Sequence, residues 1–416
     1  AGPRCGMSDL RRFFSSAAGG AAPKRPRVAE ASRVPCAAAG PEAPSPSPCQ
    51  RPRDPRRLIT WNANGFMTRV SSPEDLAAFQ ALVREHDPDV ICLQEARIKA
   101  HCNDPKAKVS SSDPRDRSRP LEAEMQGPLG AALRAAPLDS YDVFWSLANG
   151  RAAGTAMFVH RRLGPAEGAV VCSLDDALAA CSSEVAHGRK RPEHNPEGRI
   201  QYASFAGFDL MNTYVPNNGW TGERHAERKR WDEGVESFLS ARSKAQPRHL
   251  IWCGDLNVAH RPEDSTDEEA FRGEWDRDGK RFATKEAYLE AIPEDDRGIP
   301  GFSNNERSRF DRLLAAGSLV DAWRHLHPAN GPKPDAGDAA FTWRGTPAVQ
   351  SRFRARYEGM GQRLDYFLVS EALVSQVVRC EILGRGVTRL GFLGSDHCPV
   401  LLELKGGPEP VGEGGA

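Results

Sequence analysis

Residues 249–257 read His-Leu-Ile-Trp-Cys-Gly-Asp-Leu-Asn, and this stretch decides the kind of fold that the chain adopts. The run from 249 to 254 is almost wholly apolar, which is typical of a strand buried on both faces of a sheet. Two polar residues, Asp255 and Asn257, follow directly where the strand ends. A buried strand that ends in a carboxylate and an amide predicts a sheet with a polar site at its edge.

The same arrangement recurs along the chain, because other apolar runs also end in, or contain, an amide or a carboxylate. These polar positions are Asn62 and Asn64 with the run 57–62, Glu95 after 89–94, Tyr214 and Asn217 with 208–215, and Asp365 within 364–369. A further cluster, Asp396 and His397, precedes a last strand at 400–404, and additional strands are expected at 155–160 and 200–206. One such polar residue is commonly a turn former, but six clusters in one chain indicate a site.

Helical patterns lie between these runs. Ser72 and Pro73 are typical of the start of a helix, another helix is expected over 222–240, and a third carries Phe310 and ends before Gly317. Strands and helices are mixed along one core, which predicts an α/β fold in a single domain.

Composition divides the chain into three parts. Residues 1–57 hold eleven Lys and Arg against four Asp and Glu and show no apolar periodicity, so we predict a disordered basic tail. Residues 58–405 form the predicted catalytic domain, and 406–416 a second disordered tail. Within the domain, 101–140, 173–197 and 262–305 are polar and weakly periodic, and are interpreted as surface insertions.

Several classes of protein are disfavoured by composition. The net charge is zero, so bulk basicity gives no argument for nucleic-acid binding. No apolar run approaches the roughly 20 residues that span a bilayer, so no membrane partner is expected. The ten cysteines include no C-x-x-C pair. They are interpreted as reduced, mostly buried thiols of an intracellular protein.

The residue types at the strand ends point to a hard metal ion. Buried carboxylates need partners, and a divalent cation is an efficient one that several can share. Oxygen ligands without zinc-type Cys and His spacing favour Mg²⁺, with Mn²⁺ as a substitute. Such ions commonly serve phosphate chemistry.

The motifs resemble those of the endonuclease/exonuclease/phosphatase superfamily and, within it, the exonuclease III class of AP endonucleases. They are Leu-Ile-Thr-Trp-Asn-Ala-Asn-Gly-Phe (58–66), Asp-Val-Ile-Cys-Leu-Gln-Glu (89–95), Glu-Gly-Arg (197–199), Tyr-Val-Pro-Asn (214–217), Gly-Asp-Leu-Asn-Val-Ala-His (254–260), Arg-Leu-Asp-Tyr-Phe-Leu (363–368) and Leu-Gly-Ser-Asp-His-Cys-Pro-Val (393–400). Superfamily members that act on lipids, inositol phosphates or RNA tails share the Glu, Asp-x-Asn and Ser-Asp-His elements. The Tyr-Val-Pro-Asn, Val-Ala-His and Arg-Leu-Asp-Tyr fragments resemble AP endonucleases in particular, and the motifs together cover nearly all of 58–405.

The resemblance implies a four-layer α/β sandwich, in which two packed mixed sheets are flanked by helices, with a metal site at one edge. It also implies the roles of individual residues. Glu95 holds Mg²⁺, helped by Asn62, Asn64 and Asp396. Asp255 orients and deprotonates water, Asn257 donates to the phosphate, His397 pairs with Asp365 and contacts the phosphate, and Tyr214 and Asn217 complete the pocket. One-ion and two-ion readings stay open, and in the second Asp255, Asn257 and His397 also become ligands.

The implied activity is hydrolysis of the phosphodiester bond 5′ of an abasic site in double-stranded DNA, with 3′ phosphodiesterase or 3′ to 5′ exonuclease activity at the same site. A monomer is expected. Predicted DNA contacts, besides Asn217, are Arg224, Arg228, Phe341, Trp343, Arg352, Arg354 and Arg356. The sequence departs from the family where Asn64 replaces an Asp found in some members and where Gln362 replaces an aromatic residue.

Other interpretations were weighed. An RNA deadenylase or a phosphoinositide phosphatase would share the metal site but lack Tyr-Val-Pro-Asn. A catalytically silent scaffold would have lost Glu95, Asp255 or His397. A secreted nuclease would need a signal peptide and disulfides.

The N-terminal tail carries two further signals. Lys24-Arg25-Pro26-Arg27 indicates the nucleus, whereas an Ala-, Ser- and Arg-rich start also suits import into a mitochondrion or plastid. Leu10, Phe13 and Phe14 resemble a sliding-clamp binding box that has Met7 in place of its Gln.

Overall fold

The computed structural model describes residues 52–101, 118–148, 152–166, 170–171, 177, 198–219, 221–245, 248–268, 271, 276–277, 280–328, 340–345 and 359–406, all of which belong to one unit, Gln50–Ala416. Several sequence predictions lie outside these residues and stay predictions. They are the clamp box with Leu10, Phe13 and Phe14, the basic run 24–27, the tail 407–416, Glu197, and the arginines Arg352, Arg354 and Arg356.

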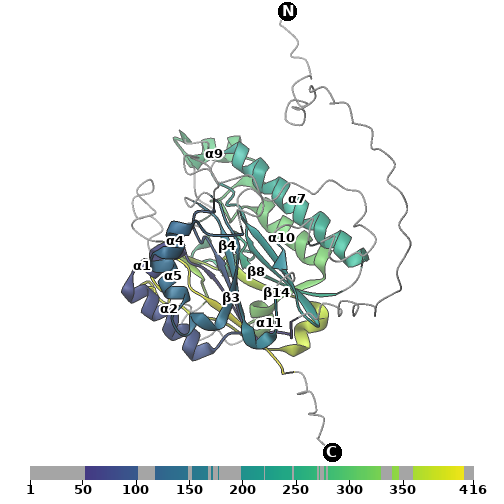
Figure 1. The fold of residues 1–416 in the computed structure, drawn as a ribbon. Coiled ribbons are helices and arrows are strands. Elements are labelled where there is room, and N and C mark those ends of the chain that lie inside the picture. Colours follow the sequence, from purple (N-terminus) through teal and green to yellow (C-terminus); the bar gives the residue numbers. More distant parts are fainter. Residues whose placement is uncertain are drawn as a thin grey trace, which may run out of the picture. The chain divides into compact units, whose positions relative to one another are not determined.

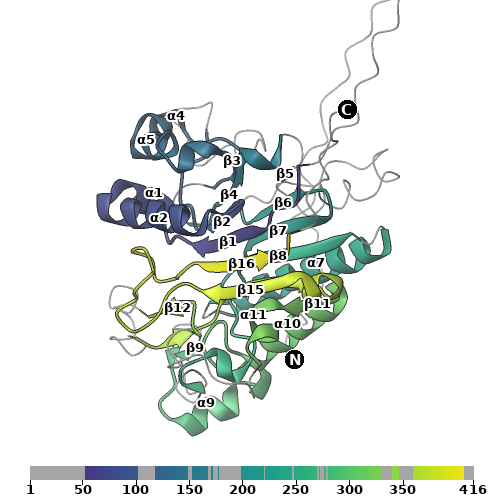
Figure 2. The same ribbon diagram turned by 90° about the horizontal axis from the view of Figure 1, so that it is seen from below.

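Two six-stranded sheets form the centre of the molecule. In the first, the strand order is β15 (Val377–Ile382), β16 (Val400–Leu404), β1 (Arg57–Asn62), β2 (Val90–Gln94), β4 (Thr155–His160) and β3 (Tyr141–Ser146). In the second, it is β11 (Leu319–Asp321), β14 (Asp365–Ser370), β8 (His249–Asp255), β7 (Phe208–Tyr214), β6 (Ile200–Ser204) and β5 (Val170–Val171). Figure 2 shows the strands of the first sheet one above another, from β3 to β15.

Each sheet is mixed and contains one parallel pair, β1 with β2 and β7 with β8, among antiparallel neighbours. Parallel strands end at the same edge of a sheet. The polar residues that follow β1 and β2 therefore lie together, and so do those that follow β7 and β8.

Helices cover the outer face of each sheet (Figure 1). On the side of the first sheet lie α1 (Phe66–Ser71), α2 (Pro73–His86), α4 (Glu122–Gln126) and α5 (Pro128–Leu133). On the side of the second lie α7 (Gly222–Ala245) and α10 (Asn304–Gly317). Shorter elements are α9 (Lys285–Ala291), α11 (Ala322–Leu326), and the strand pairs β9 (Asp276–Arg277) with β10 (Lys280–Arg281) and β12 (Trp343–Arg344) with β13 (Gly361–Gln362).

Three apolar cores explain the layers. Side chains alternate between the faces of a strand, so Ile251 in β8 packs between the two sheets whereas Trp252 packs toward α7 and α10. Likewise, Leu58 in β1 faces the other sheet and Ile59 faces α1 and α2. Both faces of both sheets are buried, and the predicted four-layer fold is confirmed.

The predicted helices are present with small shifts of their ends. Ser72 caps α2 by accepting a hydrogen bond from the Asp75 amide at 3.3 Å, with Pro73 at the first helical position. The predicted helix 222–240 extends to Ala245, and the helix that carries Phe310 ends at Gly317. The edge strands β3 and β15 were not predicted, because β3 is only partly buried and β15 has alternating charges.

The interpretation of 262–305 as a surface insertion was wrong for part of it. Phe271 and Phe302 are almost fully buried and form a small fourth core with Ile299 and Leu364. Asp264, 1% exposed, accepts a hydrogen bond from the side chain of Arg363 at 2.9 Å. Within 101–140, α5 similarly buries Leu129. Both segments are polar in overall composition, and composition does not reveal the few buried side chains that attach each segment to the domain.

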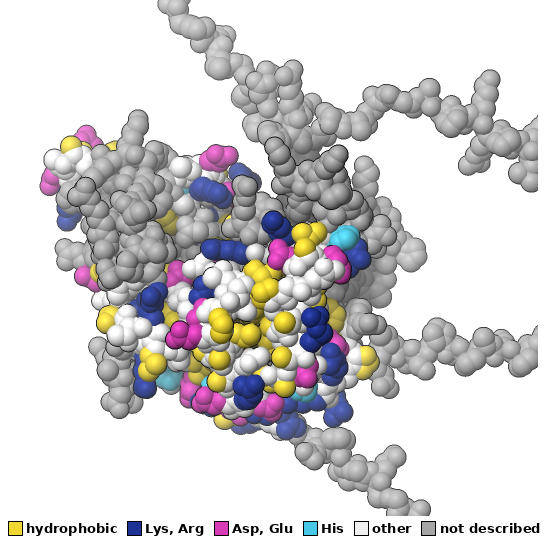
Figure 3. Space-filling view, turned by 60° about the vertical axis from the view of Figure 1, so that its left-hand side comes forward, with side chains coloured by type: hydrophobic (Ala, Val, Ile, Leu, Met, Phe, Trp, Pro, Cys, Tyr) yellow, Lys and Arg dark blue, Asp and Glu magenta, His cyan; other side chains and the backbone are white. Residues whose placement is uncertain are grey.

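Two other sequence expectations concern composition. Cys92, Cys253, Cys380 and Cys398 are buried and free, as predicted for the cysteines that the structure describes. Among the described residues, no helix is long and apolar enough to cross a membrane. On the face drawn in Figure 3, basic and acidic side chains are interspersed, in keeping with the zero net charge.

Candidate active site

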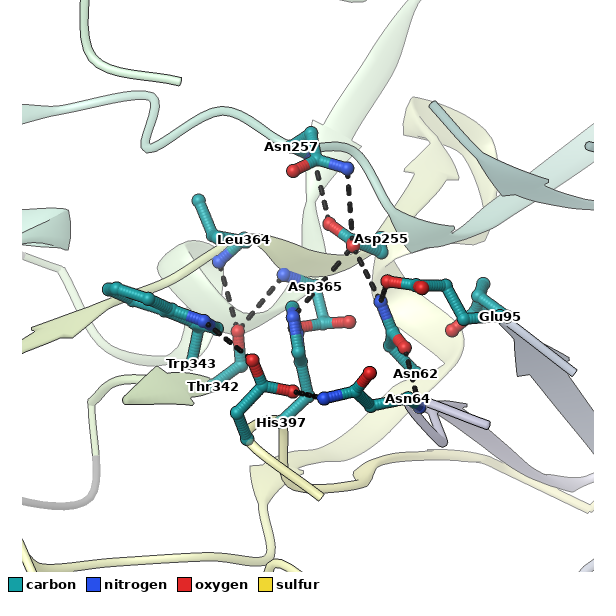
Figure 4. Close-up of polar contacts among 12 residues, drawn as sticks. Asn62, Asn64, Glu95, Asp255, Asn257, Thr342, Trp343, Leu364, Asp365 and His397 are labelled. Carbon is teal, nitrogen blue, oxygen red and sulfur yellow. Dashed lines mark hydrogen bonds and ion pairs between the residues drawn. The ribbon is translucent and has the colours of Figure 1, made fainter. Parts of the chain in front are cut away.

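Five polar side chains from five strand ends converge at one edge of the sandwich (Figure 4). Asn62 ends β1, Glu95 follows β2, and Asp255 ends β8. Asp365 begins β14, which pairs antiparallel with β8 so that Asp365 lies opposite Asp255. His397 precedes β16, which is antiparallel to β1. The topology alone therefore explains why these residues meet.

His397 lies between two carboxylates. Its Nδ1 atom is 2.8 Å from Oδ2 of Asp365, and its Nε2 atom is 3.9 Å from Oδ2 of Asp255. Burial lowers the pKa of the imidazole, but the charges of Asp365 and Asp255 outweigh burial and raise the pKa of His397 to about 10. A ring with this pKa is a cation at neutral pH.

Asp255 is 1% exposed and is held from several sides. Asn62 Nδ2 donates to its Oδ2 at 2.8 Å, and the backbone amide of Asn257 donates to its Oδ1 at 2.9 Å. Burial raises the pKa of Asp255 to about 7, although the positive charge of His397 acts in the opposite direction. This carboxyl group can therefore exchange a proton near neutral pH.

Glu95 and Asn62 are neighbours, but Asn62 presents its nitrogen to the site. Asn62 Oδ1 accepts a hydrogen bond from the Asn64 amide at 2.9 Å, which fixes the orientation of the side-chain amide. Its Nδ2 atom then faces Glu95 Oε1 at 3.2 Å. In this arrangement the nitrogen of Asn62 orients two carboxylates, those of Glu95 and Asp255. Its role as a metal ligand stays a prediction.

Asp396 and Asn64 form a second polar group beside the first. Asn64 Nδ2 donates to Asp396 Oδ1 at 2.7 Å, and the indole nitrogen of Trp343 donates to Asp396 Oδ2 at 3.2 Å. The predicted DNA contact Trp343 is therefore at the site and is attached to Asp396. Its neighbour Phe341 is only 7% exposed, which leaves it little surface for DNA.

Tyr214 is the last residue of β7, and Asn217 lies on the loop that follows it. Asn217 Nδ2 donates to Asn257 Oδ1 at 3.1 Å, and Asn257 Nδ2 donates to the Val215 carbonyl at 2.8 Å. Burial, together with the charges of Glu95 and Asp255, raises the pKa of Tyr214 well above its ordinary value. The phenol consequently keeps its proton at neutral pH and can donate it.

Three site residues have left-handed backbone conformations. The φ angles are 45° at Asn64, 48° at Glu95 and 49° at Asn257. Asn adopts this region more readily than other side chains, whereas Glu rarely does. Unfavourable backbone conformations persist where the surroundings impose them, and they gather at functional sites.

A divalent cation fits the donors that the structure presents. Ligand atoms of Asp255, Asp365 and His397 lie within 4.8 Å of one another. Among the described residues, they are the group of three or more His, Cys, Asp or Glu side chains that could hold a metal ion. Asp365 Oδ1 is buried without a hydrogen-bond partner, so it has a free acceptor at the site. Asp255 and His397 belong to the ligands predicted for a second ion, whereas Asp365 was not predicted as a ligand. Glu95, 2.8 Å from Arg97 Nε through Oε2, lies outside the group.

The two predicted DNA contacts on α7 differ. Arg224 is exposed and pairs with Glu227 at 3.1 Å, so it remains a candidate. Arg228 is 2% exposed, and its guanidinium donates to buried oxygens of the protein itself. The prediction that Arg228 contacts DNA was wrong, because helix α7 directs this side chain inward.

Sequence reasoning missed several residues that hold the site in place. Thr342 Oγ1 accepts the amides of Leu364 and Asp365 at 2.9 and 3.0 Å. Ser395 Oγ donates to the Asn62 carbonyl at 2.8 Å and accepts from the His397 amide at 3.1 Å. Arg199 stacks over the ring of Tyr214 at 4.7 Å. Arg199 and Ser395 stand inside quoted motifs, and Thr342 lies between the predicted contacts Phe341 and Trp343. Those positions were the available signal.

Comparison with known proteins gives one consistent result. Residues 59–397 match the Endonuclease/Exonuclease/phosphatase family. A DNA-(apurinic or apyrimidinic site) endonuclease from Arabidopsis thaliana is 38% identical over 353 residues, which are 84% of this chain and 85% of the relative. An exodeoxyribonuclease from Bacillus subtilis is 28% identical over 83% of this chain and 98% of its own length.

A solved structure supports the fold. The AP endonuclease LMAP from Leishmania major superposes with a TM-score of 0.55 at 23% sequence identity, and covers 85% of this chain and 88% of the other. At this identity the likeness concerns the arrangement of sheets and helices, which agrees with the two sheets and flanking helices described above.

Proposed function

Because this chain belongs to the endonuclease/exonuclease/phosphatase family, we propose that it is a DNA repair endonuclease of the exonuclease III class, which hydrolyses the phosphodiester bond 5′ of an abasic site. The observation that carries the proposal is the meeting of Asp255, Asp365 and His397 at the strand ends, beside Asn257 and Asn217 of the Tyr-Val-Pro-Asn loop.

Asp255 is the group that removes a proton from the attacking water. Its two oxygens accept hydrogen bonds from Asn62 and Asn257, so the carboxylate is held in one orientation. A base that is already oriented lowers the entropy cost of reaching the reacting geometry, and such orientation is one of the larger sources of catalysis. The expected geometry is in-line, with water on one side of phosphorus and the leaving oxygen on the other.

His397 and Asn257 contact the phosphate in this proposal. His397, held by Asp365 and positively charged at neutral pH, stabilises negative charge on a non-bridging oxygen. Asn257 Nδ2 donates to the Val215 carbonyl at 2.8 Å and to Asp255 Oδ2 at 3.3 Å, and in this proposal the N–H that faces Asp255 turns to the same phosphate. Tyr214, which keeps its proton, assists departure of the 3′ oxygen.

Glu95, with Asn62, Asn64 and Asp396 beside it, is the residue that would hold a divalent cation, which we propose to be Mg²⁺ with Mn²⁺ as a substitute. Asp255, Asn257 and His397 would become ligands only if a second ion bound, and His397 would then have to lose its proton. Such a cation supplies positive charge to the phosphate and its leaving oxygen when it is bound. Asn64 and Asp396, which are hydrogen-bonded to each other, adjust the charge beside it.

The test uses a labelled DNA duplex with a single abasic analogue, incubated with the full chain in Mg²⁺ and in EDTA. The proposal expects one cut 5′ of the lesion, leaving a 3′ hydroxyl that a polymerase extends, and no cut in EDTA. Cleavage of intact duplex at the same rate, or equal cleavage in EDTA, would overturn it. A duplex with a plain 3′ end measures the exonuclease activity that the bacterial relative's name suggests. A duplex with a blocked 3′ end measures the 3′ phosphodiesterase activity.

A further inference from the structure

Arg228 is buried in α7 and binds the backbone of the two loops that carry the site. Its Nη1 atom donates to the carbonyls of Pro216 at 3.0 Å and Asn257 at 3.2 Å, and its Nη2 atom donates to the carbonyl of Leu256 at 3.0 Å. These carbonyls follow the ends of β7 and β8. One planar side chain therefore joins both loops.

The carboxylate of Asp232 holds the Arg228 guanidinium on the side away from the two loops. Asp232, one helical turn further along α7, accepts from Arg228 Nε at 2.9 and 3.1 Å. Arg309 of α10 donates to the same carboxylate at 2.7 Å. Asp232 is 2% exposed. A buried carboxylate with two arginines leaves Arg228 one low-energy orientation, with its free N–H groups toward the loops.

The carbonyls that Arg228 binds belong to residues in contact with the reacting groups. Asn257 donates to Asp255 through its amide, to Val215 through Nδ2, and accepts from Asn217. Asn257 also has a φ angle of 49°, a conformation that its surroundings must hold. Fixing the carbonyls of Leu256 and Asn257 fixes the peptide planes on both sides of this strained residue.

We propose that Arg228 is a positioning residue for turnover, which acts through Asn257 by holding the Tyr-Val-Pro-Asn loop and the Asp-Leu-Asn loop in register. The kinetic test of this proposal rests on the proposed function, because it measures cleavage of abasic DNA. The role requires a side chain with several donors in one plane. Lysine keeps the charge, but cannot span three carbonyls and a carboxylate.

The same helix offers a matched control. Arg242, 5% exposed, donates to Asp209 at 2.7 Å, to the His249 carbonyl at 3.0 Å and to the Tyr202 hydroxyl at 2.9 Å. Asp209 and His249 lie at the starts of β7 and β8, whereas Arg228 binds beyond their ends. Arg242→Lys therefore disturbs an equally buried arginine of α7 at the edge away from the site.

The experiment compares Arg228→Lys and Arg242→Lys in the full chain. Both variants are expected to lower the melting temperature. Only Arg228→Lys is expected to lower kcat for the abasic duplex, by on the order of tenfold to a hundredfold as for a misplaced reacting group, with KM little changed. Equal kcat losses in the two variants, or none in either, would overturn the proposal.

A double-variant cycle tests the route through Asn257. If Arg228 acts through Asn257, then Arg228→Lys combined with Asn257→Ala should be about as slow as Asn257→Ala alone. For Arg242→Lys combined with Asn257→Ala, the loss in rate should instead equal the product of the two single losses. Losses that multiply for Arg228→Lys would show that it acts elsewhere.

Hydrogen exchange separates this inference from the proposed function. Arg228→Lys should speed amide exchange in the segments 214–218 and 254–258, and Arg242→Lys should not. This readout needs no substrate, so it still decides the positioning role if wild type fails to cut abasic DNA. Unchanged exchange in both segments contradicts the inference. Should Arg228→Lys fail to fold, Arg309→Lys loosens Asp232 from the other side, and the same exchange pattern is expected in weaker form.

Discussion

The Nδ1 atom of His397 lies 2.8 Å from Oδ2 of Asp365, while the Nε2 atom of the same ring lies 3.9 Å from Oδ2 of Asp255. One carboxylate thus holds the ring through a hydrogen bond, and the other lies within ion-pair distance of its opposite nitrogen.

This relationship predicts that His397 and Asp365 act as one unit. His397→Ala and Asp365→Ala should each slow incision strongly, because either change removes a correctly oriented charged ring. The double variant should be scarcely slower than the worse single variant, since residues that act together give non-additive losses. Single-turnover rates at saturating enzyme measure this, and losses that multiply would mean that the two residues work separately.

Glu95→Gln is predicted to raise the Mg²⁺ concentration required for half-maximal rate. The change removes one negative charge while keeping the shape of a side chain that is already bound to Asn62 and Arg97. A Mg²⁺ titration of incision measures the shift, and the maximal rate should recover at high Mg²⁺. A titration that superimposes on wild type would exclude Glu95 as a ligand.

Asn64→Asp is predicted to make stability depend on divalent cation. Asn64 Nδ2 lies 2.7 Å from Asp396 Oδ1, so the change replaces a donor by a second carboxylate at hydrogen-bond distance. In EDTA the lost hydrogen bond and the new repulsion should cost about 1–3 kcal/mol. Mg²⁺ should restore much of the melting temperature. Identical melting in EDTA and Mg²⁺ would argue that no cation binds beside Asp396.

The ion pair of Asp264 with Arg363 predicts a pH dependence of stability. Burial raises the pKa of Asp264, but the nearby Arg363 and Arg324 outweigh it and hold this pKa below the ordinary value. The native state therefore binds this proton less tightly than the unfolded chain. The stabilisation is complete above about pH 4, the ordinary Asp value, and is lost as the pH falls through the lower native value.

Asp264→Asn tests this dependence, because it leaves Arg363 buried without its main partner. Denaturant unfolding at pH 7 should show a loss of about 3–5 kcal/mol, and the difference from wild type should shrink as the pH falls below 4. The exposed pair of Asp142 with Arg161 serves as a control, and Asp142→Asn should cost under about 1 kcal/mol. A loss at pH 7 that stays constant down to pH 3 would refute the assignment.

The strands and the residues at their ends were predictable from sequence, because a buried strand needs an apolar run and a polar residue at its end interrupts that run. Asp255, Asp365 and His397 were found in this way. Asn62 was placed at the site, but its hydrogen bonds to Glu95 and Asp255 could not be predicted, since a sequence gives no orientation for an amide. Asp264 was missed because its partner Arg363 is distant in sequence.

Arg228 shows both the limit and a signal that was overlooked. Charged runs on helices are usually solvated, and 228–230 read as Arg-Lys-Arg. Yet Arg228 follows the spacing of Trp231, Val235 and Phe238, the apolar stripe of α7, so helical periodicity alone placed it inward. The periodicity gave the direction of this side chain. The carbonyls that it binds come from two loops, and only the fold reveals them.

Single-turnover incision of an abasic duplex by Asp255→Asn in saturating Mg²⁺ tests the proposed role of Asp255 as the base. The substitution keeps the shape of the side chain and removes the base that Asn62 and Asn257 hold. If Asp255 is the base, the rate should fall by about a hundredfold or more, as for loss of a general base, while binding of the duplex is retained. Incision at the wild-type rate would contradict it.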